Sequence, residues 1–215
     1  MYFKYKNINF HKMSDMLNYN VKIDHYIKLL IIGDSKVGKS SFIKRFLEDA
    51  FSPNDEINAK ELESKNKILE IDNQKMLFHV WDGLKNAATN KTTKSELSIR
   101  IQGIIIMYDV SNYTSFDSIE YYINQVKEKC GSDMPIIVIG NKNDLDRVVN
   151  QYEGEKLAKN NNVEFIETSV YKNINIDESI IQLANKIIRC SYFKGNTITL
   201  THKRKFKGKK KKKYC

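Results

Sequence analysis

The chain has 215 residues, of which 41% are hydrophobic, and this is enough for one α/β domain with a complete core. No apolar stretch approaches the roughly 18 residues of a membrane-spanning helix. Charged and amide side chains interrupt the N-terminal segment, which argues against a secretory signal. Cys130, Cys190 and Cys215 are an odd number at long spacings, so we expect reduced thiols and neither a disulfide nor a zinc site.

The net charge of +10 lies mainly in one segment near the C-terminus. Lys203–Lys213 holds nine basic residues and no acid, and removing these nine leaves about +1 for the rest of the chain. We therefore expect a tail that self-repulsion keeps disordered and that seeks an anionic surface. Nucleic-acid binding through this tail is disfavoured, because the sequence indicates neither a basic domain face nor a base-stacking platform.

Strand-like and helix-like patterns alternate along the chain, which predicts an α/β fold with a six-stranded, mostly parallel sheet and helices on both faces. The fourth and fifth strands are almost continuously apolar, as expected for strands covered on both faces. Only DNQK separates the second strand from the third, so these two are expected to form an antiparallel hairpin. The expected strands are Lys28–Ile32, Lys67–Ile71, Met76–Trp81, Gly103–Val110, Pro135–Gly140 and Val163–Glu167.

Three helices are expected between and after these strands. The first begins at Lys39, directly after a glycine-rich loop. The second runs from Ser115, its expected cap, to about Val126, with apolar residues at helical spacing. The third follows Asn175, which can cap it, and Glu178 can complete a capping box.

The octapeptide GDSKVGKS follows the first expected strand and matches the pattern G-x-x-x-x-G-K-[ST]. In such a loop the glycines let backbone N–H groups surround phosphate oxygens, the lysine reaches the β- and γ-phosphates, and the serine hydroxyl ligates Mg²⁺. The helix that follows directs its positive dipole end at the same anion. A chance match is the alternative interpretation, and the strand–loop–helix context argues against it. The expected phosphate-binding residues are Gly33, Asp34, Ser35, Lys36, Val37, Gly38, Lys39, Ser40 and Ser41.

A second polar loop, GNKND at Gly140–Asp144, follows the fifth expected strand. Asp144 can accept hydrogen bonds from N1–H and the N2 amino group of guanine, a pair of donors that adenine cannot offer. Asn141 can bond the purine edge or tie this loop to the phosphate loop, and the Lys142 stem can lie over the base. The pair Asn-Asp at a strand end can also be a simple turn. The two loops in this order predict a guanine nucleotide site.

Together these motifs resemble the Ras superfamily of small GTPases, and within it the Rab branch, over about residues 26–190. The segments GDSKVGKSSFIKRF, WD, YDVSNYTSF, GNKNDL and ETS follow the order and spacing of that family. The resemblance implies a P-loop NTPase G domain that binds GTP or GDP with Mg²⁺, a role in vesicle trafficking, and effectors and exchange factors as partners. It also implies that Phe51 packs against the guanine and that Ser169 and Val170 meet the base. Tyr171 replaces the lysine that usually supports the base.

The two nucleotide-sensing segments of the family are altered in this chain. The resemblance makes Asp82, which ends the third expected strand, a Mg²⁺-side residue together with Ser40. Asn58 stands where a threonine would close over Mg²⁺ and the γ-phosphate. After Asp82 the family reads Thr-Ala-Gly-Gln and this chain reads Gly-Leu-Lys-Asn, so Lys85 replaces the glycine and Asn86 the catalytic glutamine.

These substitutions predict guanine-nucleotide binding with weak or absent hydrolysis. The γ-phosphate loses contacts that order the switch segments in the triphosphate state. Asn86 is one methylene shorter than glutamine, and Ras-type enzymes turn over unaided at only about 10⁻⁴ s⁻¹. Two alternatives stay open. Thr92 or Thr93 could supply the missing hydroxyl, or the chain could be a pseudo-GTPase scaffold that does not switch.

We expect the domain at residues 26–192, between an extension of unknown role at 1–25 and a tail at 193–215. Cys215 is a single terminal cysteine, and Rab proteins carry prenylated cysteines at or near this position. One lipid chain with the basic run Lys203–Lys213 would make a two-signal anchor. The expected location is therefore cytoplasmic, peripheral on the cytosolic face of an internal membrane. A solvated tail with a free thiol, or a nuclear address, is the alternative.

Overall fold

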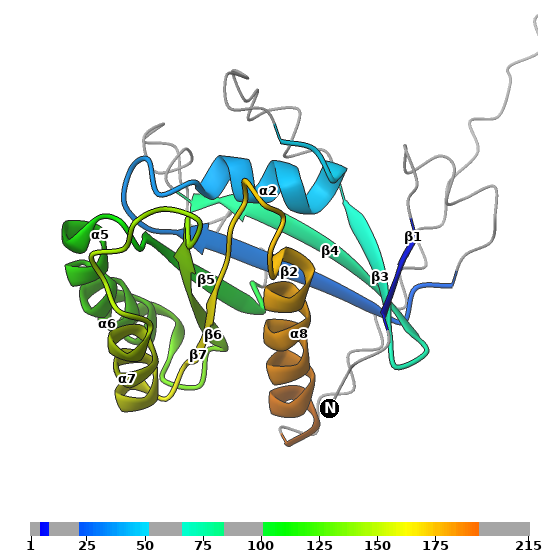
Figure 1. The fold of residues 1–215 in the computed structure, drawn as a ribbon. Helices are drawn as coiled ribbons and strands as arrows, with labels where there is room; N and C mark the ends of the chain where they lie inside the picture. The colour runs from blue at the N-terminus through cyan, green and yellow to red at the C-terminus, as the bar shows by residue number, and fades with distance from the viewer. Residues whose placement is uncertain (1–4, 9–21, 52–65, 84–100, 194–215) are drawn as a thin grey trace, which may run out of the picture.

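The structure, a computed structural model, describes residues 5–8, 22–51, 66–83 and 101–193. These residues form a seven-stranded sheet with helices on both faces (Figure 1). The strands are β1 Tyr5–Ile8, β2 His25–Ile32, β3 Lys67–Ile71, β4 Gln74–Asp82, β5 Gly103–Asp109, β6 Ile136–Asn141 and β7 Glu164–Glu167. The helices are α2 Lys39–Glu48, α5 Tyr113–Asp117, α6 Ile119–Cys130, α7 Gln151–Asn161 and α8 Ile176–Phe193.

The sheet order is β1-β3-β4-β2-β5-β6-β7, and the predicted α/β class with a mostly parallel sheet is confirmed. Strands β4, β2, β5, β6 and β7 are parallel to one another, and β3 is antiparallel to β4. All six expected strands are present, with no end displaced by more than three residues. The seventh strand, β1, pairs antiparallel with β3 and lies in the segment to which the sequence analysis gave no role.

The hairpin predicted from DNQK joins β3 to β4 through the two residues Asp72 and Asn73. Both have positive φ angles, 50° and 63°. Two-residue hairpin turns need this left-handed backbone, and Asp and Asn adopt it at lower cost than most residues.

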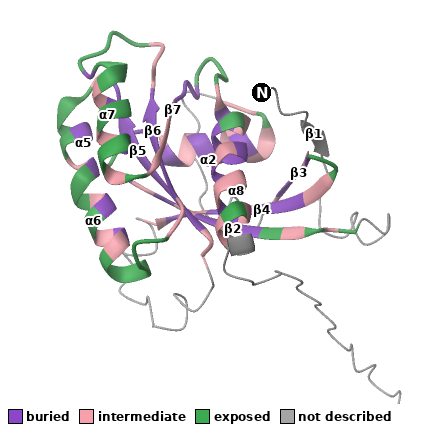
Figure 2. Cartoon of the chain, turned by 90° about the horizontal axis from the view of Figure 1, so that it is seen from below, coloured by how far each residue is buried: buried purple, intermediate pink, exposed green. Residues whose placement is uncertain are grey.

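Alternate residues of the central strands face two separate apolar clusters. On one face Ile105 and Met107 of β5 pack with residues of α2 and α8, including Phe42 and Leu183. On the other face, residues of β5 and β6 pack with α5, α6 and α7. Figure 2 shows the strands buried between helices whose outer surfaces are exposed. This layering leaves the carboxyl ends of the parallel strands as the place where polar loops gather.

Two details of the predicted helices are wrong. The helix expected from Ser115 to Val126 is divided into α5 and α6, and Asn112 caps α5 by accepting a hydrogen bond from the Thr114 N–H (3.1 Å). Ser115 lies inside α5, where its buried hydroxyl donates to the Asn112 carbonyl oxygen (2.8 Å). The cap is therefore the amide side chain of Asn112, three residues before the hydroxyl of Ser115 that was predicted.

Helix α7 was not predicted, although a capping box marks its start. The Asn150 side chain accepts from the Tyr152 N–H (3.2 Å), and the Glu153 carboxylate accepts from the Asn150 N–H (2.8 Å). Asn175, expected to cap α8, donates its side-chain amide to the Glu167 carbonyl oxygen (2.8 Å). None of the described helices combines the length and apolarity needed to cross a membrane.

Candidate nucleotide-binding site

The glycine-rich loop between β2 and α2 has two positions that only glycine fits. Gly33 has φ 141°, and a Cβ atom there would lie 2.2 Å from the Met107 carbonyl oxygen. Gly38 has φ 101°, and its Cβ atom would lie 2.5 Å from the side-chain nitrogen of Asn141. The loop can therefore lie against neighbouring backbone and side chains as a concave peptide surface, the form that surrounds phosphate oxygens.

Lys39 opens α2 and is buried in this loop. Its Nζ atom donates to the carbonyl oxygens of Gly33 (3.0 Å) and Asp34 (2.5 Å). The ammonium group is thus held where the loop curves, next to the start of α2, whose N–H groups and dipole also favour an anion. Of the other loop residues, Ser35 and Lys36 are exposed.

Asp34 fixes the loop to the helices of the opposite face. Its carboxylate accepts hydrogen bonds from the Ser118 hydroxyl (3.0 Å) and the Tyr122 hydroxyl (2.8 Å). Burial and the bond to Asp34 raise the pKa of Tyr122 to about 12. The phenol therefore remains a donor to Asp34 at neutral pH.

The structure brings together the two residues expected at a magnesium ion. The Ser40 hydroxyl donates to Oδ2 of Asp82 (2.9 Å), and Asp82 is buried at the end of β4, directly beside β2. A hydroxyl and a carboxylate are hard oxygen ligands that suit Mg²⁺. In the described parts of the chain, no group of three or more His, Cys, Asp or Glu side chains is arranged to hold a metal ion by itself. These two groups fit an ion that takes its other ligands from phosphate and water.

Asn141 makes hydrogen bonds to two other loops, as expected for one of the two roles that the sequence left open. Its side-chain amide donates to the Val37 carbonyl oxygen (2.9 Å) in the phosphate loop. Its Oδ1 accepts from the Thr168 hydroxyl (3.1 Å) and from the Val170 N–H (3.4 Å), both beyond the end of β7. The structure therefore favours the role in which Asn141 ties the loops together.

Asp144 is positioned by Ser169, one of the residues expected to meet the base. The Ser169 hydroxyl donates to Oδ1 of Asp144 and accepts from the Lys172 N–H (2.9 Å). Ser169 is fully buried. The arrangement fixes the carboxylate through one oxygen and leaves further acceptor capacity for N1–H and the amino group of a guanine.

Lys142 makes an ion pair that the sequence analysis missed. Its Nζ lies 2.6 Å from Oδ2 of Asp109, which ends β5. Burial acts to raise the pKa of Asp109, but hydrogen bonds from Lys142 and Ser111 outweigh it, so the pKa lies below its usual range. Asp109 belongs to the YDVSN segment, and its place at the end of a predicted parallel strand was the available signal.

Arg45 joins the aromatic residues on the expected base side of the site. Its Nε donates to the Val170 carbonyl oxygen (3.1 Å), and its guanidinium lies 5.5 Å from the centre of the Phe51 ring. Phe51 in turn packs edge-to-face with Tyr171, with ring centres 5.8 Å apart. Sequence reasoning gave Arg45 no role because it lies in the last turn of a helix expected only to pack.

Trp81, next to Asp82 in β4, packs its ring edge-to-face on His79, with centres 5.0 Å apart. Its indole N–H is buried and finds no acceptor among the described residues.

Several residues predicted from the sequence lie outside the described ranges. They are Asn58, Lys85, Asn86, Thr92, Thr93, the run Lys203–Lys213 and Cys215.

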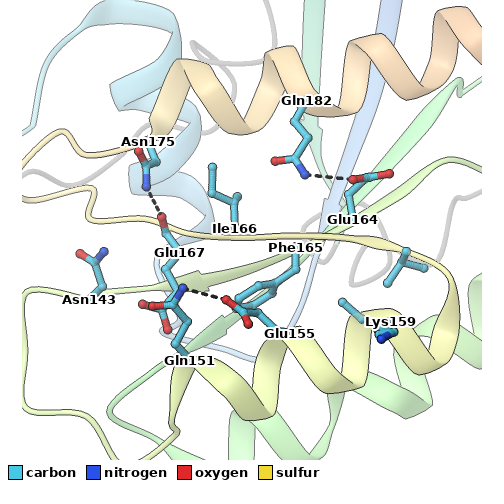
Figure 3. A pocket seen from close by; sticks show the side chains of 12 residues that line it. Asn143, Gln151, Glu155, Lys159, Glu164, Phe165, Ile166, Glu167, Asn175 and Gln182 are labelled. Atoms are coloured by element: carbon cyan, nitrogen blue, oxygen red, sulfur yellow. Dashed lines mark hydrogen bonds between the residues drawn. The ribbon is translucent and has the colours of Figure 1, made fainter. Parts of the chain in front are cut away.

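A separate groove of about 470 Å³ lies between α7 and α8, over β7 (Figure 3). Four of its polar side chains form two hydrogen-bonded pairs. Gln151 donates to Glu155 (2.9 Å), and Gln182 donates to Glu164 (3.0 Å). The groove therefore lacks the converging donors of the phosphate loop and is not part of the nucleotide site.

The fold and these loops define a P-loop α/β domain, with a phosphate loop after the first parallel strand and an Asn-Lys-x-Asp loop at the end of β6. Sequence comparison agrees, since the Ras family model matches residues 28–189. The chain belongs to the Ras family.

Its relatives include Rab proteins. The chain is 36% identical over 167 residues to Ras-related protein Rab-8 of Diplobatis ommata, covering 77% of this chain and 79% of the relative. It is 35% identical over 167 residues to human Ras-related protein Rab-8B, covering 77% and 80%. It also matches human EF-hand calcium-binding domain-containing protein 4B at 34% identity over 163 residues, covering 75% of this chain and 22% of that protein. The predicted resemblance of this chain to Rab-like small GTPases is confirmed.

Proposed function

We propose that this chain is a Rab-like guanine-nucleotide-binding protein of intracellular vesicle or membrane trafficking, with weak or impaired GTP hydrolysis. One observation carries the proposal. Asn141 connects the phosphate loop at Val37 with the loop after β7 at Thr168 and Val170. The phosphate-binding and base-binding parts of the site are thus parts of one hydrogen-bonded unit.

In this function the phosphates bind the loop Gly33–Ser41, with Lys39 as the buried cation. Ser40 and Asp82 hold Mg²⁺, which neutralises phosphate charge when it is bound. Asp144 selects guanine, and the Lys142 stem lies against the base. Phe51 and Val170 contact the base from its sides.

Weak hydrolysis follows from the substitutions in the two switch segments. Asn58 lacks the hydroxyl of the threonine that the family uses at the γ-phosphate. Lys85 lacks the backbone freedom of the family's glycine, and Asn86 has a shorter side chain than the family's glutamine. A ligand shifts a conformational equilibrium only through contacts that differ between the two states. Loss of these contacts weakens both the switch and the positioning of water.

The test is to identify the nucleotide that co-purifies and to measure single-turnover hydrolysis of GTP. We expect bound GDP or GTP and a rate below the roughly 10⁻⁴ s⁻¹ of unaided Ras-type enzymes. The double substitution Lys85→Gly with Asn86→Gln should raise the rate. Absence of any guanine nucleotide affinity would refute binding, and a family-typical rate in the unaltered chain would refute impaired hydrolysis.

A pseudo-GTPase scaffold is the second candidate, favoured by the same altered switch segments. The two candidates differ in how partners respond to nucleotide. A switch protein binds its effector more tightly in the GTP-analogue state than in the GDP state, whereas a scaffold binds its partner equally in both. Comparing partner binding in the two states separates them.

The proposed location is the cytosolic face of an internal membrane, through the polybasic run Lys203–Lys213 and a prenylated Cys215. Each basic residue near an anionic leaflet contributes about 1 kcal/mol, and a lipid chain supplies the second signal. Replacing Cys215 by Ser should move the protein from the membrane fraction to the soluble fraction of cells. An unchanged membrane fraction would count against lipidation.

A further inference from the structure

Lys67, the first residue of β3, carries a buried ammonium group. Only 3% of this residue is exposed, and a lysine is almost never buried to this extent unless it is paired. Its Nζ atom lies 2.9 Å from Oδ1 of Asp177, in the first turn of α8. The same atom lies 3.4 Å from Oδ1 of Asp49, which directly follows α2. One ammonium group thus joins the start of β3 to two helices.

The neighbours of this ammonium group are not equally fixed. Nζ also lies 4.8 Å from the centre of the Phe46 ring of α2, and Phe46 is fully buried in the core. A cation over an aromatic ring is attracted by it. The Asp177 side chain is 14% exposed, whereas that of Asp49 is 46% exposed. Asp49 is therefore the neighbour whose position depends most on Lys67.

Asp49 determines how the chain leaves α2 toward Phe51, two residues later. Its φ angle is 53°, a left-handed conformation that is uncommon outside glycine. Its N–H donates to the Arg45 carbonyl oxygen (3.0 Å), and its own carbonyl oxygen accepts from the Arg45 guanidinium (3.1 Å). That guanidinium also faces the Phe51 ring. Arg45 thus holds the backbone of Asp49, and Lys67 holds its side chain.

We propose that Lys67 is a positioning residue for the guanine base, because it holds Asp49 at the end of α2 and thereby fixes the place of Phe51. The inference rests on the proposed function, in which Phe51 contacts the base. Removing the ammonium group leaves Asp49 and Asp177, which both lie against it, as neighbouring like charges that repel each other. The more exposed Asp49 then moves, and the backbone that leads to Phe51 moves with it. The bound nucleotide is released faster as a result.

The test is the rate at which the full chain with Lys67→Met releases a fluorescent GDP analogue. Methionine keeps the packing on the Phe46 ring and removes the charge. We expect release to be about tenfold faster, the factor that corresponds to the loss of one hydrogen bond between charged groups. In a Phe51→Ala background the same substitution should change the rate by less than about twofold, because its effect passes through that ring. A purely structural role would accelerate release equally in both backgrounds.

Asp49→Asn supplies a second, milder variant, since its side chain is half exposed and its loss should not prevent folding. It should also accelerate release in the presence of Phe51 and not in the Phe51→Ala background. Combining it with Lys67→Met removes the repulsion between the carboxylates, so the double variant should release GDP no faster than Lys67→Met alone. Lys156→Met makes the same substitution at an exposed position of α7 and is the matched control, with unchanged release.

Two results would overturn the proposal. One is unchanged GDP release in both Lys67→Met and Asp49→Asn, and the other is equal acceleration with and without the Phe51 ring. The affinity of the unaltered chain for GDP is measured first. Absence of that affinity would refute the proposed function and this inference together, whereas normal affinity with unchanged release would refute this inference alone.

Discussion

Arg45 is the residue whose contacts best account for the unusual base loop. It donates to the Val170 carbonyl oxygen, and its guanidinium faces the Phe51 ring. Tyr171, which stands where relatives of this type use a lysine, packs on that same ring. Arg45 thus brings a cation from α2 to the Phe51 ring.

Replacing Arg45 by Lys should accelerate GDP release about tenfold, because a hydrogen bond from a charged donor contributes about 1.5 kcal/mol. Lysine keeps the charge but cannot reproduce the planar contact with ring and carbonyl. The measurement is the dissociation rate of a fluorescent GDP analogue. Lys156→Ala, on the exposed side of α7, is the control and should release GDP like the unaltered chain. Equal rates in all three proteins would show that Arg45 does not support the base.

Asp109 gives the site a dependence on acid pH. Its folded-state pKa is lowered, so its ion pair with Lys142 stabilises the domain above the ordinary pKa of 3.8 and loses this effect as pH falls through the lower, folded-state value. Asp109→Asn should therefore be less stable than the unaltered chain at pH 7, and the difference should shrink below about pH 3.8. Urea unfolding of both proteins at pH 7 and below about pH 3.8 measures the difference in the free energy of unfolding. Asp146→Asn, at an exposed position, should show no such convergence.

At the scale of elements, α7 shows how a short local motif determines where a helix begins. Asn150→Ala removes the acceptor of the capping box and should lower the free energy of unfolding by about 1 kcal/mol. Asn160→Ala, an exposed position inside the same helix, is the matched control. It should leave stability unchanged or slightly raised, because alanine has the higher helix propensity. Equal urea midpoints for both variants would contradict a capping role for Asn150.

The central strands β5 and β6 could be predicted from sequence because their apolar runs are almost continuous, and the others because short β-prone runs stand between turn residues. Helix boundaries were harder, since they depend on which of several polar residues caps the chain. Asn112 and Ser115 both suit a cap, and only the folded backbone distinguishes them. β1 could not be predicted, because a four-residue edge strand is stabilised by a partner about sixty residues away in sequence.

The candidate site was predictable as a set of residue types but not as a set of contacts. The loop spacing identified Lys39, Ser40 and Asn141, because phosphate and base binding need those side chains at those places. Whether Asn141 bonds the base or the phosphate loop depends on distances that only the folded structure supplies. Asp109 was missed for the same reason, since its partner Lys142 lies in the loop that follows the neighbouring strand β6.

At the scale of the whole molecule, the loops that follow β2, β6 and β7 and the last residue of β4, Asp82, lie at the carboxyl ends of the parallel strands of a single sheet. Asn141 and the bond between Ser40 and Asp82 connect these loops across the strands. A nucleotide that contacts several of them stabilises strands from both halves of the sheet, so binding and global stability are coupled.

Guanine nucleotides should therefore raise the melting temperature of the purified, nucleotide-depleted protein. At a concentration of about 100 Kd, GDP with Mg²⁺ should add about 2.7 kcal/mol to the free energy of unfolding. ADP at the same concentration should add much less, because adenine cannot satisfy Asp144. Equal shifts with GDP and ADP would contradict selection of guanine by Asp144.

Trp81 is the only tryptophan of the chain, and it directly precedes Asp82 at the end of β4. Its indole is packed against His79 and has a buried N–H group. Intrinsic fluorescence excited at the indole absorption band thus arises from one point in the molecule, beside the carboxylate expected at the metal ion. We therefore expect the fluorescence of Trp81, excited at wavelengths where the tyrosines do not absorb, to change when nucleotide and Mg²⁺ bind, which would allow loading and release to be followed without an attached dye.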